Sequence, residues 1–384
     1  MAPVPASAGT IGSDAAIWRA QRRILALDGG GIRGIVSLAF LERIEELLRT
    51  RSGRGDAFRL SEHFDMIGGT STGAIIAAGL ALGRSVSQIK DLYLELGPAV
   101  FRNRWHVPFI QARYGSDRLG AILQREFGDI TLEDPALRTL LAVITKRVDT
   151  GSPWIISNVT TQPYWHDRDD GTHGNRHIGL ASIVRASAAA PFYFGPERIP
   201  ISADVVGTFI DGAVSPYNSP TIPLLLLATA GRYGLNWPLG PGALSIVSVG
   251  TGRSRLPPPA AWTPSAMLAV DSLRGVIEDT MSLSLMMMQW LGTSEAPVHL
   301  NRDIGTLEGE PLGGRPLFAF QRFDLRLEEK WLETYFGLPF EAKEIIRLSR
   351  LDDPASMPAL YDLAREVAER TIRPEPPLHV PDSP

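Results

Sequence analysis

The chain of 384 residues contains no cysteine, so disulfide bonds, thiolate metal sites and cysteine nucleophiles are excluded. The chain also lacks a large excess of charge of either sign: its formal net charge of -4 is too small to indicate a nucleic-acid partner. No apolar run approaches the roughly 18 residues of a membrane span. The first residues lack the basic start and apolar stretch of a secretory signal. We therefore expect a cytoplasmic protein.

What is present fits an ordinary globular protein. Apolar residues make up 44% of the chain and charged residues 21%. A chain of this length can bury the core of one large domain or of two smaller ones.

Short apolar runs alternate with stretches of helical periodicity, which predicts an α/β fold with a largely parallel sheet. The expected strands are 24–27, 64–67, 140–145, 154–157, 209–210 and 244–249, and the clearest expected helices are 35–48, 87–96 and 180–190.

Composition divides the chain into four expected parts. Residues 1–20 are rich in Ala, Pro, Ser and Gly and predict a flexible leader. The alternating pattern defines an α/β core over 21–254, and Pro257-Pro258-Pro259 marks the boundary to a mainly helical portion, 255–373. The Pro-rich tail 374–384 is predicted to be disordered.

Ser71 is the first candidate for chemistry. It stands in Gly69-Thr70-Ser71-Thr72-Gly73, a G-x-S-x-G placed where an apolar strand turns into a helix of small residues. Such a turn holds the serine in a tight bend with its hydroxyl directed outward, and the flanking glycines avoid clashes with the neighbouring strand and helix.

A glycine-rich loop, Asp28 to Gly34, follows the first expected strand and opens a helix. One interpretation is a dinucleotide-binding fingerprint, G-x-G-x-x-G, with pyrophosphate at the helix N-terminus. That fingerprint needs an acidic residue about 20 positions on, at the end of a second strand. Here that strand ends in Gly68-Gly69. The other interpretations are an oxyanion hole made by glycine N–H groups and a tight turn without a ligand.

A serine nucleophile needs a base. Among seven histidines only His299 follows a candidate acid, and no local pattern supports it. Asp211 is better placed, because it ends the apolar segment Thr208-Phe209-Ile210 and is expected at the sheet edge that carries Ser71. Partial burial would raise its pKa and let it take the serine proton directly. Asp-Gly is also a common turn dipeptide, so Asp211 alone would not be decisive.

Four motifs in order resemble those of the patatin-like phospholipases: ALDGGGIRG, GTSTG, ASAAAPFYF and DGA. The resemblance covers roughly residues 22–220 and implies a three-layer α/β/α fold that hydrolyses lipid acyl esters with a Ser–Asp dyad, without histidine, metal or organic cofactor. It also implies a role for each matching residue. These are Ser71 as nucleophile, Asp211 as proton acceptor, Gly30 and Gly31 as oxyanion hole, Arg33 as support for the loop or contact to a phosphate, and Gly29, Gly34, Gly69, Gly73 and Gly212 as supporting positions.

The chain departs from that pattern after Asp211. Asn218-Ser219-Pro220 stands where many family members carry paired asparagines, which puts the packing of this loop in question.

The Met-rich stretch 283–291 predicts a buried helix, with an acyl-chain channel or a membrane contact as the alternative. The expected partners are a lipid or lysolipid substrate and a transient membrane surface, with no nucleic acid. Two alternative functions stay open: a nucleotide-binding protein that uses Gly29 to Gly34, and a lipid-binding protein without catalysis.

Overall fold

The computed structural model describes residues 21–101, 116–191, 193–254, 265–337 and 339–373. The leader and tail expected at 1–20 and 374–384 lie outside the described residues, as does the proline run 257–259.

A central eight-stranded sheet organises the fold, with the order β5-β6-β3-β2-β1-β7-β9 and with β4 paired to β3. The strands from β3 to β9 along this order are parallel, whereas β4, β5 and β6 join antiparallel. The mixed but mostly parallel α/β sheet agrees with the expectation. The strands are β1 (Arg22–Leu27), β2 (Met66–Thr70), β3 (Leu140–Arg147), β4 (Ser152–Ser157), β5 (Glu197–Pro200), β6 (Val206–Asp211), β7 (Leu244–Val249) and β9 (Ala319–Phe323); β8 (Arg253–Ser254) and β10 (Arg326–Leu327) form a separate pair.

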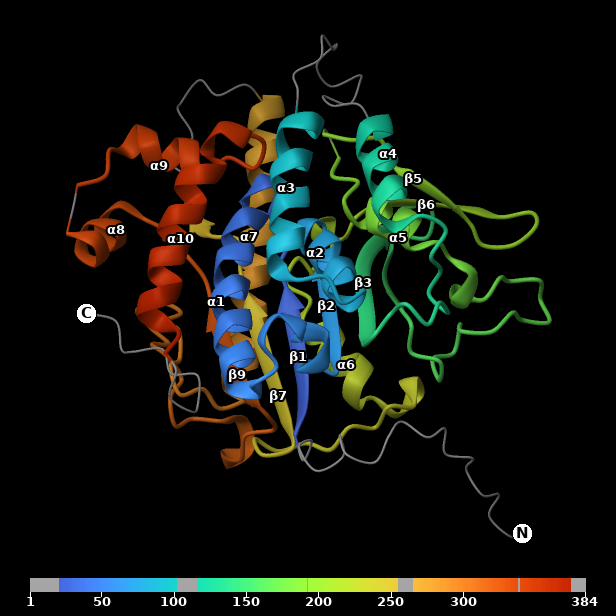
Figure 1. Ribbon diagram of the computed structural model, residues 1–384, viewed down its shortest axis with the longest axis horizontal. Helices are drawn as coiled ribbons and strands as arrows, with labels where there is room; N and C mark the ends of the chain where they lie inside the picture. The colour runs from blue at the N-terminus through green and yellow to red at the C-terminus, as the bar shows by residue number, and fades with distance from the viewer. Residues whose placement is uncertain (1–20, 102–115, 192, 255–264, 338, 374–384) are drawn as a thin grey trace.

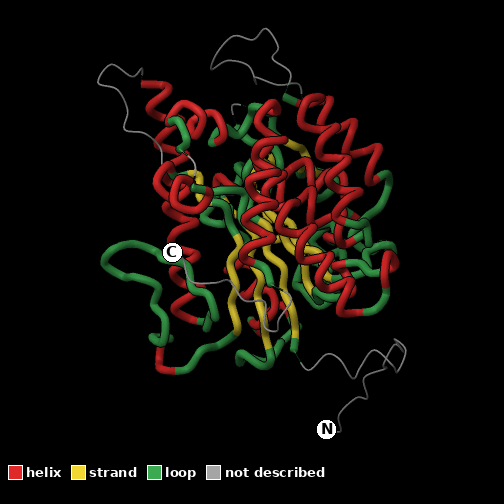
Figure 2. The backbone as a smooth tube through the Cα atoms, turned by 60° about the vertical axis from the view of Figure 1, so that its left-hand side comes forward, coloured by secondary structure: helices red, strands yellow, loops and turns green. Residues whose placement is uncertain are grey.

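Helices cover both faces of the sheet, so the fold is the expected three-layer α/β/α arrangement (Figures 1 and 2). One face carries α1 (Gly34–Ser52), α2 (Thr72–Ala81), α3 (Val86–Val100), α4 (Ser116–Phe127), α5 (Leu180–Ser187) and α10 (Met357–Thr371). The other face carries α6 (Thr221–Thr229) and α7 (Ser265–Leu291). The short helices α8 (Glu329–Phe336) and α9 (Ala342–Leu348) precede α10.

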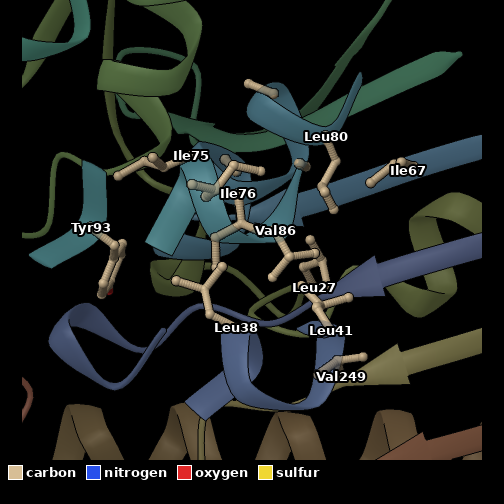
Figure 3. Close-up of a cluster of buried hydrophobic side chains, with 14 of the residues drawn as sticks. Leu27, Leu38, Leu41, Ile67, Ile75, Ile76, Leu80, Val86, Tyr93 and Val249 are labelled. Carbon is tan, nitrogen blue, oxygen red and sulfur yellow. The ribbon is translucent and has the colours of Figure 1, made fainter. Parts of the chain in front are cut away.

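Strand alternation explains the two layers, because successive side chains of a strand point to opposite faces. In β1, Leu25 and Leu27 join the core under α1 and α2, whereas Ile24 and Ala26 join the core under α6 and α7. Figure 3 shows Leu27 packed among side chains of α1 and α2. Both faces of β1 are buried, which is why the strand reads as a continuous apolar run.

Most element boundaries differ from the predictions by a few residues, and three differences bear on the site or the sheet. β2 begins at Met66 rather than Phe64, and α5 ends at Ser187 instead of Ala190. The third difference lies in the segment expected to be mainly helical, where β9 adds a strand beside β7 in the central sheet. The adjacent polar residues Gln321 and Arg322 interrupt both an apolar run and a strict alternation, so the sequence pattern did not reveal this buried strand.

Candidate active site

Ser71 lies in the turn between β2 and α2 with φ +54° and ψ -120°, a backbone conformation that residues other than glycine rarely adopt. The flanking glycines are sterically required. A Cβ on Gly69 would lie 2.1 Å from the carbonyl oxygen of Gly73, and one on Gly73 would lie 2.2 Å from that of Leu27. The turn is therefore a tight strand-to-helix bend that projects the serine, as the G-x-S-x-G motif predicts.

Asp211 reaches Ser71 by a route that a parallel sheet would not allow. β6 runs antiparallel to β3, so its carboxyl end would ordinarily point away from the edge that carries Ser71. Thr70 pairs with Ile144 of β3, and Asp211 pairs with the next residue, Thr145. β4 occupies the other side of β3 over the same residues, so β6 and β2 lie end to end along one side. The two carboxyl ends therefore meet, and the expected proximity has a different cause.

The Oγ of Ser71 donates a hydrogen bond of 2.5 Å to Oδ2 of Asp211. Asp211 is only 2% exposed, and its Oδ1 accepts from the backbone N–H of Ala213 at 2.8 Å. Burial raises the pKa of Asp211 to about 7, although the hydrogen bonds from Ser71 and Ala213 oppose this shift. A carboxylate that titrates near neutrality and touches the serine hydroxyl can act as its proton acceptor.

The end of α5 fixes both members of this pair. The backbone N–H of Ser71 donates to Oγ of Ser187 at 2.8 Å, and that hydroxyl donates to the carbonyl oxygen of Ile144 at 2.6 Å. The N–H of Asp211 donates to the carbonyl oxygen of Ala189 at 3.0 Å. The sequence analysis gave Ser187 no role, so this contact is one that it missed.

The glycine loop lies directly against the serine. A Cβ on Gly29 would be 3.2 Å from Cβ of Ser71. The three carbonyl groups of Gly29, Gly30 and Gly31 all accept hydrogen bonds, from Thr251 Oγ1 (3.1 Å), the Arg33 N–H (3.1 Å) and the Tyr93 hydroxyl. Within the described part of the chain, nothing accepts a hydrogen bond from the N–H groups of Gly30 and Gly31. Two consecutive donors beside Ser71 suit the stabilisation of an oxyanion.

The remaining glycines serve close packing. Gly31 has φ +58°, and a Cβ there would lie 2.4 Å from the carbonyl oxygen of Leu351. Gly34 leaves room for the Thr72 and Tyr93 side chains, and Gly212 lies against the backbone of β3.

Arg33 has few partners for a guanidinium group near the site. Its Nη1 is 3.4 Å from Oγ of Ser254 and 3.4 Å from the carbonyl oxygen of Ser349, and its buried Nε has no hydrogen-bond partner. Burial lowers the pKa of Arg33, while the charges of Asp324 and Glu278 raise it.

A buried ion cluster supports the loop from β9. Nη2 of Arg322 lies 2.6 Å from Oδ2 of Asp28 and 2.7 Å from Oδ2 of Asp324. All three side chains are nearly inaccessible. Arg322 joins the residue before Gly29 to a strand far away in the sequence, and the sequence analysis did not find it.

Two other sequence candidates lie elsewhere. His299 is exposed in the loop after α7 and is not among the described partners of Ser71 or Asp211. The Met-rich stretch is buried on one side only: Met288 is inaccessible, whereas Leu283 is 53% exposed and Trp290 37%. The prediction of a buried helix therefore holds for one face of α7.

In the described part of the chain, no helix is long and apolar enough to cross a membrane. Nor do three or more His, Asp or Glu side chains there gather in a way that could hold a metal ion.

Comparison with known proteins identifies the family. The family model described as "Patatin-like phospholipase" matches residues 25–225, which is more than half of the chain. The chain belongs to the patatin-like phospholipase family. The matched region includes the end of β1, the glycine loop, Ser71 and Asp211.

Several curated proteins are similar over this region. A cUMP-AMP-activated phospholipase of Escherichia coli is 33% identical over 54% of this chain and 59% of its own length. A cGAMP-activated phospholipase of Escherichia coli strain TW11681 is 27% identical over 55% of this chain and 57% of its own length. Patatin of Solanum tuberosum is 30% identical over 54% of this chain and 53% of its own length. The match thus spans little more than half the length of these relatives.

Proposed function

We propose that the chain is a serine hydrolase that cleaves carboxylic esters of lipids with a Ser71–Asp211 dyad. The observation that carries this proposal is the 2.5 Å hydrogen bond from Ser71 to a buried carboxyl group whose pKa is raised to about 7. Family membership supports the choice of a lipid substrate.

In the first half-reaction Ser71 Oγ bonds to the carbonyl carbon of the ester while its proton passes to Oδ2 of Asp211. The carbonyl electron pair moves onto oxygen, and the N–H groups of Gly30 and Gly31 stabilise this oxyanion. When the tetrahedral intermediate collapses, the ester C–O bond breaks, and the leaving alcohol takes the proton from Asp211. An acyl-enzyme remains on Ser71.

In the second half-reaction water attacks the acyl-enzyme. Asp211 accepts a proton from the water as its oxygen bonds to the acyl carbon, and it returns this proton to Ser71 Oγ as the fatty acid leaves. Every proton is returned within the cycle, so the dyad needs neither a histidine nor a cofactor. Arg33 would either support the glycine loop through its contacts with Ser254 and Ser349 or meet the phosphate of a phospholipid substrate.

The alternative of a dinucleotide site receives less support. The second glycine of that fingerprint, Gly31, would let a pyrophosphate approach the backbone, but the space beside its Cα is filled by the backbone of Leu351. The alternative of a lipid-binding protein without catalysis would leave the Ser71–Asp211 contact and its strained turn without a purpose.

The test has two parts. A fluorophosphonate probe should label the wild type and the matched control His299→Ala, and should fail on Ser71→Ala. Fatty-acid release is then measured on a panel of phospholipid, lysophospholipid, galactolipid and neutral glyceride. Because two relatives are named for activation by cGAMP or cUMP-AMP, each substrate is assayed with and without each nucleotide. Labelling that survives in Ser71→Ala, or release of fatty acid by that variant, would contradict the assignment.

A thermal-shift screen with NAD, FAD and ATP addresses the nucleotide alternative. A clear shift in melting temperature, together with no esterase activity on any substrate, would favour that alternative over hydrolysis.

A further inference from the structure

We propose that Thr251 and Asn218 are positioning residues that aim the Gly30 N–H at the oxyanion. This inference rests on the proposed function and concerns two side chains that bind the loop from opposite parts of the chain. Both donate hydrogen bonds to the same atom, the carbonyl oxygen of Gly29: Thr251 Oγ1 at 3.1 Å and Asn218 Nδ2 at 3.3 Å.

The geometry of the peptide bond connects this contact with catalysis. The carbonyl of Gly29 and the N–H of Gly30 belong to one planar trans peptide, so they point in opposite directions. Two donors that hold the carbonyl oxygen therefore also set the direction of the N–H. They also polarise the peptide, because hydrogen bonds in a chain strengthen one another in a buried environment.

Thr251 is placed rigidly enough for this task. It is 1% exposed, and its side chain fills the space that a Cβ on Gly30 would need, at 2.1 Å from Oγ1. The backbone on either side is bound to the end of β9 and to the residue that follows it, through the Gly250 N–H to the carbonyl of Phe323 (2.8 Å) and the Gly252 N–H to Oδ1 of Asp324 (2.9 Å). Thr251 lies beyond residue 225, where the family model ends.

Asn218 holds the loop from the other side. It is 4% exposed. Besides the bond from its side chain to the carbonyl of Gly29, its backbone carbonyl oxygen accepts from the Gly29 N–H at 3.1 Å. Its Nδ2 also contacts Sδ of Met281 at 2.8 Å, which ties this asparagine to α7. One residue earlier, the carbonyl of Tyr217 accepts from Oγ1 of Thr70 at 2.7 Å. The loop after Asp211 is thereby joined to the glycine loop and to the end of β2.

The single asparagine is therefore sufficient for this contact in the segment where many family members carry two. Thr251 and Asn218 orient the Gly30 N–H, whose partner oxygen carries a full charge only in the transition state. Loss of either side chain should therefore lower kcat and leave ground-state binding unchanged. Removing an oxyanion donor itself costs roughly 10²–10³-fold in kcat. Loosening one should cost less, about tenfold.

The experiment compares Thr251→Val, which removes the hydroxyl and keeps the shape, with Thr251→Ser, which keeps the hydroxyl, and with Asn218→Ala. For each variant we would measure melting temperature, kcat and KM for fatty-acid release, and inhibition by two lipid analogues. A trifluoromethyl ketone forms a tetrahedral oxyanion with the serine, whereas an ether analogue has no carbonyl and reports ground-state binding only.

We expect Thr251→Val and Asn218→Ala each to lose about tenfold in kcat and in affinity for the ketone, with KM and ether affinity unchanged. Thr251→Ser should retain most of the wild-type kcat. Ketone affinity equal to the wild type in a folded Thr251→Val or Asn218→Ala protein would overturn the proposal, as would a rise in KM at constant kcat. Should one variant not fold, the other decides. A wild type that is neither labelled nor active would instead contradict the proposed function.

Discussion

Replacement of Asp211 by asparagine separates the proton affinity of this carboxyl group from its shape. Asparagine has nearly the same volume, its Oδ1 can still accept from the Ala213 N–H, and its Nδ2 can donate to Ser71. The variant should therefore fold. What it loses is the group that ionises, and with it the proton acceptor of the proposed reaction.

The structure gives the size of the effect on stability. Burial raises the pKa of Asp211 from 3.8 to about 7. At about 1.36 kcal/mol per unit, keeping this buried carboxylate ionised costs about 4 kcal/mol of folding free energy. Because the folded pKa is the higher one, the contribution of Asp211 to stability is fully present at low pH and is lost as pH rises through about 7. The asparagine variant should thus gain on the wild type with rising pH.

The assay is urea unfolding of both proteins at pH 5 and pH 8. We expect the stability difference in favour of Asp211→Asn to grow by about 2–3 kcal/mol between these values. Exposed Asp204, changed to asparagine, is the control and should show no such growth. Fatty-acid release by Asp211→Asn should be abolished. A stability difference independent of pH would refute the raised pKa, and near-normal turnover would refute the dyad.

Three further predictions follow from the same contacts. In the wild type, kcat/KM should rise about tenfold per pH unit below about 7 and level off above it, because the free enzyme needs ionised Asp211; a profile flat from pH 5 to pH 8 would contradict this. Ser187→Ala should lower the free energy of unfolding in urea by about 1–3 kcal/mol and lower activity, since it leaves the buried N–H of Ser71 unpaired, whereas Ser187→Thr should keep the stability and the activity. Arg322→Met should cost about 3–5 kcal/mol, because it leaves Asp28 buried without a countercharge and leaves Asp324 with the more distant Arg253 at 3.6 Å; changing both aspartates to asparagine should recover part of that loss.

Local sequence chemistry was enough for the parts of the fold that depend on neighbours along the chain. A strand buried on both faces is a continuous apolar run, as in β1, whereas a helix buried on one face shows apolar residues with a period of 3.6, as in α1. The sequence therefore predicts both elements. The strained turn at Ser71 is equally local, since only the flanking glycines permit it. The resemblance of four ordered motifs then indicated the family that the comparison confirmed.

Boundaries and polar strands were beyond that reach. The sequence is compatible with a helix that continues to Ala190, yet α5 ends at Ser187. There the Ser187 hydroxyl donates to the carbonyl of Ile144, and the carbonyl of Ala189 accepts from the N–H of Asp211. β9 carries Arg322 on a strand buried in the sheet. A charged residue there is tolerated because Asp28 and Asp324 neutralise it, and no periodicity reveals such a partner.

The sequence by itself determined which residue types carry the proposed chemistry: a serine on a strained turn, a glycine loop and an aspartate at the end of a strand. Only the tertiary structure decided how they meet. Asp211 reaches Ser71 because β6 lies end to end with β2 along β3, and its pKa rises because that junction is buried. Thr251 and Arg322 come to the glycine loop from more than 200 positions away. Such contacts depend on the pairing of strands distant in sequence, which a local pattern does not record.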